Sequence, residues 1–163
     1  MGEIKAKTHL EKLGFSDSDK KKSKHDIIQK WVCDNVEQII SETVMAKNPH
    51  PYTIEEVKWE HQVIYENGNY KMLVGYVDVM VHIKGKFYFN DSNEYENSEH
   101  FVFVEVKTEI PVLGELIRQM RAYQAYNKKR TSYLVVSPDD RHIETLNQQG
   151  FWFYKYNDPT KLF

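Results

Sequence analysis

The sequence contains one cysteine, Cys33, so it cannot form an internal disulfide, and a reducing compartment is expected. It also lacks an apolar run of 18 residues, the length that a membrane-spanning helix requires. Its N-terminal residues are polar and charged and do not contain the apolar stretch of a secretory signal. These absences predict a cytoplasmic protein without a membrane span.

Several motifs of other protein classes are missing. The chain has no P-loop and no G-x-G-x-x-G, so ATP or dinucleotide binding is not supported. It has no G-x-S-x-G for an esterase, and its seven histidines show no zinc-site spacing with Cys33. The formal net charge of −2 gives no general signal for nucleic acid. A nucleic-acid-binding protein of this composition must therefore use local basic patches and metal ions.

The chain divides into a polar, lysine-rich N-terminal arm, residues 1–24, and a single domain, residues 25–163. The lysines of the arm are consistent either with a solvated segment or with a segment that contacts phosphate groups. Within the domain, apolar periodicity and turn signals such as Asn67-Gly68 predict eight elements. These are a helix over 25–45, strands over 56–65, 71–83 and 101–108, a helix over 113–127, a strand over 132–136, a helix over 139–149 and a strand over 151–156.

The predicted order is αβββαβαβ, which indicates an α/β fold with a mixed central β-sheet flanked by α-helices. The first three strands can form an antiparallel meander. The strand-helix-strand-helix-strand order that follows implies right-handed crossovers and parallel pairing. Lys86 to Phe89 is consistent with a further short strand after a turn at Gly85, and a polar acidic loop is expected over residues 90–100.

Charged residues interrupt two of the apolar strands. Asp78 lies in the stretch VGYVDVMVHI, where Val77, Val79, Val81 and Ile83 are expected to form the opposite face. Glu105 and Lys107 lie in FVFVEVK and share a face, about 6.6 Å apart along the strand. Unpaired buried charge costs several kcal/mol, so these side chains require each other, a metal ion or water.

Asp78 followed by Glu105-Val106-Lys107 resembles the signature of the PD-(D/E)xK nuclease superfamily. In that family an acidic residue lies on the second core strand and an acid-x-Lys on the third. The proline of the family name is absent here, since Val77 precedes Asp78. The resemblance implies a restriction-endonuclease-like core.

The helix after Lys107 carries a second motif. Gln119 and Tyr123 form an i, i+4 pair on one face, and this Gln-x-x-x-Tyr is similar to the RecB-like branch of the superfamily. Glu60 on the first strand and Gly75, three residues before Asp78, also resemble that branch. The resemblance covers roughly residues 25 to 136.

The resemblance implies a metal-dependent hydrolase that uses Mg²⁺ or Mn²⁺. Asp78, Glu105 and the backbone carbonyl of Val106 would be the metal ligands, Lys107 would act on the attacking water or the phosphate, and Gln119 would position one of them. Such nucleases often use a side chain of the first helix; helical geometry disfavours Glu37 and leaves His25 or Glu42. Glu60 and Tyr123 are further auxiliary candidates. The following basic residues contact the nucleic-acid backbone or form a solvated face: Arg118, Arg121, Lys128, Lys129 and Arg130.

The leading hypothesis is therefore a nuclease that hydrolyses phosphodiester bonds, with DNA as the expected substrate. The alternative is a noncatalytic module for nucleic-acid binding or assembly on a nuclease-like fold. Three choices stay open at this point. The enzyme can be an endonuclease or an exonuclease, its substrate can be DNA or RNA, and the protein can be a monomer or a homo-oligomer.

Overall fold

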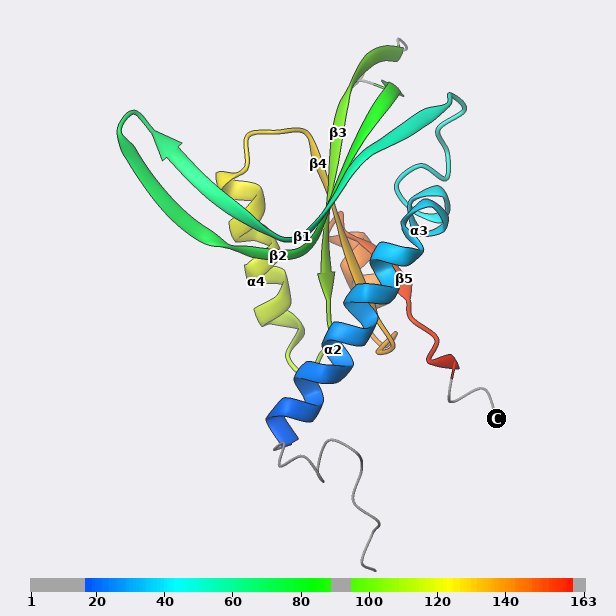
Figure 1. Ribbon diagram of the computed structural model, residues 1–163, viewed down its shortest axis with the longest axis vertical. Helices are drawn as coiled ribbons and strands as arrows, with labels where there is room; N and C mark the ends of the chain where they lie inside the picture. The colour runs from blue at the N-terminus through cyan, green and yellow to red at the C-terminus, as the bar shows by residue number, and fades with distance from the viewer. Residues whose placement is uncertain (1–16, 89–94, 160–163) are drawn as a thin grey trace, which may run out of the picture.

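The computed structural model of the protein describes residues 17–88 and 95–159. Helices α2 (Asp17–Asp34) and α3 (Val36–Glu42) precede the strands. In the described residues five strands form one sheet, ordered β1-β2-β3-β4-β5 (Figure 1). Their bounds are β1 (Tyr52–Asn67), β2 (Tyr70–Tyr88), β3 (Tyr95–Val106), β4 (Thr131–Ser137) and β5 (Trp152–Lys155), with α4 (Leu113–Tyr126) between β3 and β4 and α5 (Ile143–Gln148) between β4 and β5.

The sheet is mixed. Strands β1, β2 and β3 pair in antiparallel fashion, and β3, β4 and β5 pair in parallel. Helices α2 and α3 cover one face, and α4 and α5 cover the other (Figure 1). The expected α/β class, a mixed central sheet flanked by helices, is thus confirmed. Among the described helices, none combines the length and the apolar composition that crossing a membrane would require.

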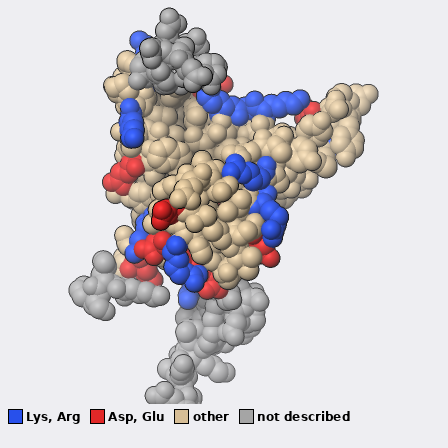
Figure 2. Space-filling view, turned by 180° about the vertical axis from the view of Figure 1, so that it is seen from behind, with Lys and Arg blue, Asp and Glu red and all other residues tan. Residues whose placement is uncertain are grey.

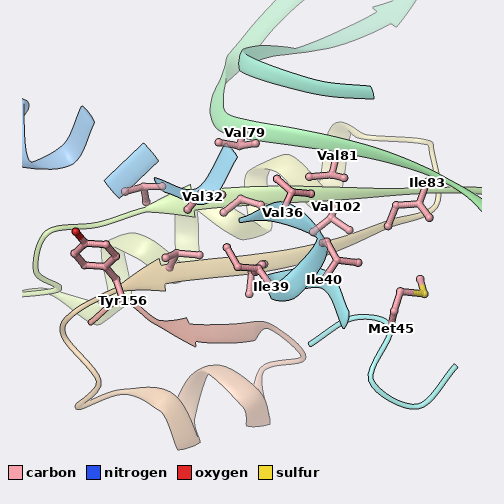
Figure 3. Close-up of a cluster of buried hydrophobic side chains, with 14 of the residues drawn as sticks. Val32, Val36, Ile39, Ile40, Met45, Val79, Val81, Ile83, Val102 and Tyr156 are labelled. Carbon is pink, nitrogen blue, oxygen red and sulfur yellow. The ribbon is translucent and has the colours of Figure 1, made fainter. Parts of the chain in front are cut away.

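The face under α2 and α3 carries the first core cluster. Figure 3 shows Val32 and Ile39 of these helices against Val79, Val81 and Val102 of the sheet. All five side chains are at most 1% exposed. β-Branched residues pack well on a pleated sheet, and burial of each side chain contributes roughly 1.5–3 kcal/mol.

The opposite face carries the second cluster. Leu116, Met120 and Tyr123 of α4 and Leu146 of α5 are its buried helical residues, and they pack against sheet residues such as Val135. Leu116, Met120 and Tyr123 therefore define the buried face of α4. This packing fixes Gln119, which lies one turn from Tyr123, at the edge of the core.

The hairpin of β1 and β2 leaves the sheet before its tip. β2 pairs with β3 only as far as Val79, whose partner is Val104, whereas β1 and β2 remain paired to Asn67 and Tyr70. The hairpin then curves around α4 (Figure 1). The turn at Asn67-Gly68 is confirmed, since Gly68 adopts a φ of 60°.

The twist of this hairpin changes one expected face. Val77 was expected to share a face with Val79, but it packs in the second cluster, against α4, and Val79 packs in the first. Strict alternation assumes a flat strand, and β2 bends between these two residues. Asp78 lies at this bend.

Several predicted boundaries were wrong. The helix expected over 25–45 begins at Asp17 and is interrupted at Asn35, whose side-chain amide donates to the carbonyl of Trp31 at 2.8 Å. Residues 17–24 of the expected arm are therefore helical, and residues 1–16 lie outside the described part of the chain.

Gly85 does not begin a turn but lies within β2, which continues to Tyr88 and includes part of the extra short strand. A Cβ at Gly85 would lie 2.9 Å from Tyr52 Cβ, so the glycine permits a close approach of β1. The end of the expected acidic loop belongs to β3, which begins at Tyr95. Residues 89–94 lie outside the described part.

Candidate active site

Asp78 occupies the point where β2 and β3 separate. The last residue of β2 paired with β3 is Val79, so the backbone N–H of Val106 has no partner on β2. This N–H donates to Asp78 Oδ2 at 2.7 Å. The hydrogen bond holds the carboxylate of Asp78 beside the Glu105-Val106-Lys107 segment.

Helix α2 contributes two side chains to Asp78. His25 Nε2 lies 3.2 Å from Asp78 Oδ1, and Gln29 Nε2 donates to the backbone carbonyl of Asp78 at 2.7 Å. The two residues are four apart and therefore share one face of α2. Hydrogen bonding to Asp78 raises the pKa of His25, against the opposing effect of burial. Of the two first-helix candidates, His25 is the one that the structure brings to Asp78.

Glu105 and Lys107 lie on one face of β3, as alternation predicts. Lys107 Nζ lies 3.9 Å from Glu105 Oε2. The side chain of Glu105 is only 4% exposed, whereas that of Lys107 is 33% exposed. Glu105 Oε1 is buried and has no hydrogen-bond partner among the described residues.

The electrostatics of Glu105 follow from this geometry. Burial raises its pKa to about 8, and the negative charge of Asp78 adds to this effect. Lys107 and then His25 act in the opposite direction because they favour the carboxylate. Asp78 and Glu105 are therefore close enough to interact as charges, and Lys107 alone does not compensate them.

Helix α4 closes the site from the other face. Gln119 Nε2 donates to Tyr123 Oη at 3.0 Å, and that hydroxyl donates to the backbone carbonyl of Tyr76 at 2.8 Å. The i, i+4 pair read from the sequence is thus a direct contact. Gly75 permits it, because a Cβ at that position would lie 3.1 Å from Tyr123 Cε1. Burial, followed by the charge of Glu105, raises the pKa of Tyr123.

Two auxiliary candidates lie elsewhere. Glu42 is exposed near the end of α3, and it hydrogen-bonds to Tyr154 and thereby raises the pKa of that phenol. Glu60 is exposed on β1 with a φ of 51°, the one non-glycine residue with positive φ in the described structure. Neither has a described contact with Asp78 or Glu105.

The basic candidates are in different environments. Figure 2 shows Lys and Arg side chains on the face that includes α4 and the base of the protruding hairpin. Arg121 donates to Gln124 Oε1 and to Gln149 O and lies over the ring of Phe151, so it fastens α4 to α5. Arg130 donates to Ser98 Oγ, and Arg118 is exposed on α4.

Gln29 is the site residue that the sequence analysis missed. It is 1% exposed, and its Oε1 has no hydrogen-bond partner among the described residues. Its position four residues after His25, beside the apolar Ile28 and Val32, is the signal that could have indicated it. A buried amide on a core-facing helix requires a partner, and Asp78 supplies one.

Within the described residues, no group of three or more His, Cys, Asp or Glu side chains is arranged to hold a metal ion. Comparison of the chain with protein-family models, curated proteins and solved structures found no match in any of the three. The geometry of Asp78, Glu105 and Lys107 is therefore the basis for a functional conclusion.

Proposed function

We propose that this protein is a metal-dependent nuclease of the PD-(D/E)xK type that hydrolyses phosphodiester bonds in DNA. The observation that supports this proposal is the convergence of Asp78, Glu105 and Lys107 where β2 separates from β3. Asp78 and Lys107 are 29 positions apart in sequence, and with Glu105 they meet at one bend of the sheet. The mixed sheet, with α2 and α4 on opposite faces, is in keeping with a restriction-endonuclease-like core.

The donor set suits a hard divalent cation. Carboxylate oxygens are the ligands that Mg²⁺ prefers, and Glu105 Oε1 is a buried oxygen without a partner in the described structure. Asp78, Glu105 and the backbone carbonyl of Val106 would hold Mg²⁺ or Mn²⁺, with His25 beside Asp78. When bound, the cation would lower the pKa of a water molecule and offset negative charge on the phosphate.

The other side chains have separate tasks. Lys107 is one-third exposed and keeps donors free at 3.9 Å from Glu105, so it can orient the attacking water or donate to a phosphate oxygen. Gln119 is held by Tyr123 and can position either group. Gln29 and the N–H of Val106 fix the backbone and the carboxylate of Asp78, which limits reorganisation during the reaction.

Cleavage of a defined substrate panel tests the proposal. Labelled linear, circular, single-stranded and junction DNAs and an RNA are incubated with Mg²⁺ or Mn²⁺. Asp78→Asn and Lys107→Met should each reduce the rate by about 100-fold or more, the scale expected for loss of one group that stabilises the transition state. The matched controls are Asp140→Asn and Lys155→Met, because these residues form an ion pair at 3.0 Å between the segment after β4 and the edge strand β5 and have no described contact with Asp78, Glu105 or Lys107.

A calorimetric titration with Mn²⁺ provides a second readout. Binding that is weakened by Asp78→Asn and retained by Asp140→Asn supports the assignment of ligands. Absence of both cleavage and cation binding in the wild type would refute the nuclease proposal and favour a noncatalytic binding module.

A further inference from the structure

A hollow lies on the α4 side of the sheet, between the curved hairpin and the segment that follows α4. Its floor includes Met80, His82 and Phe101, and its walls are residues 61–64 of the hairpin and residues 126–129. It encloses about 710 Å³. We call it the lysine groove, because Lys128 and Lys129 form one wall.

Three glutamates and three lysines line the lysine groove, and their charges are separated in space. Each glutamate forms an ion pair with a lysine of the hairpin strands. The pairs are Glu56 with Lys58 at 3.8 Å, Glu66 with Lys71 at 3.6 Å, and Glu99 with Lys84 at 3.7 Å. Lys128 and Lys129 have no described ion pair; their ammonium groups lie 5.9 Å from the centre of the Tyr65 ring and 4.9 Å from that of Phe101. Two cationic groups therefore face the groove without a carboxylate.

Flat rings lie beside these lysines. The rings of His82 and Phe101 are stacked, 4.6 Å apart and 6° from parallel, on the floor. Tyr126 is 38% exposed at the wall, against Tyr65. Proteins bind single-stranded nucleic acid by combining lysines, which contact the phosphates, with aromatic rings, on which the bases stack. A volume of 710 Å³ is that of a site for a small ligand, so it accepts one or two nucleotides rather than a duplex.

Strand β3 connects the lysine groove with the candidate active site. Phe101, Phe103 and Glu105 alternate on one face of β3, so the Cα atoms of Phe101 and Glu105 are about 13 Å apart. At roughly 3.4 Å per nucleotide, this distance corresponds to about four stacked nucleotides. We infer that the lysine groove binds the single-stranded part of a DNA substrate whose phosphodiester bond lies at Glu105, an inference that rests on the proposed function.

Binding in the absence of divalent cations tests the lysine groove separately from catalysis. The anisotropy of a fluorescein-labelled 12-nucleotide single strand is measured against salt concentration in EDTA, for the wild type and for Lys128→Ala/Lys129→Ala. Each phosphate contact contributes about 0.7 to the slope of log K against log salt, so the slope should decrease by about 1.4. At 0.1 M salt this corresponds to roughly 25-fold weaker binding.

The matched control is Lys30→Ala/Lys155→Ala, which removes the same charge from two exposed lysines that are paired with Asp34 and Asp140. It should keep the wild-type slope. Tyr126→Leu should weaken binding of the single strand by about fivefold or more without changing the slope, since stacking does not release counterions.

Three results would overturn the inference: an unchanged slope in the Lys128/Lys129 variant, an equal loss in the control, or tighter binding of a duplex than of the single strand. If the wild type then cleaves DNA and Asp78→Asn does not, the proposed function is still supported. The opposite result is also informative. If only the groove variants lose binding and the wild type does not cleave DNA, the lysine groove binds single strands and the nuclease proposal is contradicted.

Discussion

Replacement of Glu105 with glutamine should change how the stability of the protein depends on pH. Glutamine keeps the size of the side chain and removes its ionisation. Burial beside Asp78 raises the pKa of Glu105 from 4.5 to about 8 in the folded protein. Between these values the folded protein binds more protons than the unfolded chain, so the free energy of unfolding falls as the pH rises.

The size of this effect follows from the same pKa values. One pKa unit corresponds to about 1.4 kcal/mol, so the contribution of Glu105 should fall by an amount on the order of 5 kcal/mol between pH 4.5 and pH 9. The contribution is fully present below the unfolded pKa of 4.5, and most of it is lost before pH 8. For a protein whose total stability is of the order of 10 kcal/mol, this is a large change.

Urea unfolding from pH 5 to pH 9 in EDTA measures this change. The relevant quantity is the free energy of unfolding of the wild type minus that of Glu105→Gln, because most other titrations then cancel. Glu144→Gln is the control, since Glu144 is exposed on α5, and its difference from the wild type should be nearly constant. Parallel curves for the wild type and Glu105→Gln would refute the argument from burial.

Two further substitutions test packing around the site by urea unfolding. Gly75→Ala should destabilise the protein by about 1–3 kcal/mol, because the added Cβ would lie 3.1 Å from Tyr123. The control is Gly114→Ala, whose Cβ would meet only the flexible side chain of Arg118, and it should not destabilise the protein. A neutral Gly75→Ala would contradict this packing. Asp139→Ala should cost about 1–3 kcal/mol at pH 7, because Asp139 accepts from the N–H of Ile110 at 2.8 Å. Arg141 holds the pKa of Asp139 below its usual range, so this contribution is present above pH 4 and lost in acid; an equal cost in strong acid would count against the assignment.

Alternation along single strands predicted much of the candidate site. It placed Glu105 and Lys107 on one face, and the 3.9 Å contact between them agrees with that prediction. Helical spacing likewise predicted the contact between Gln119 and Tyr123. Both are local relations, for which the residue spacing alone determines which side chains are neighbours.

Relations between elements were not accessible in the same way. The choice between His25 and Glu42 depends on the break of the first helix at Asn35, which separates α2 from α3. A single continuous helix would have left both candidates on or beside its apolar face. Gln29 was missed because its role depends on the backbone carbonyl of Asp78, a group that has no signature in the sequence.

Features that normally reduce stability are concentrated around Asp78. Two of the three buried side-chain polar atoms without a hydrogen-bond partner in the described chain, Gln29 Oε1 and Glu105 Oε1, belong to residues grouped around Asp78. Glu60, with positive φ, lies on β1 between the partners of Val77 and Val79. Buried unpartnered oxygens and strained backbone persist where they are compensated by function.

Because the hydrophobic clusters on both faces of the sheet are well packed, the fold can tolerate this local cost. The same bend that separates β2 from β3 exposes the Val106 N–H to Asp78, and it lies beside Glu105, whose Oε1 has no hydrogen-bond partner among the described residues. The bend of β2 is thus the structural cause of the candidate site, and a substitution that straightened β2 would remove the site even if every proposed catalytic side chain were kept.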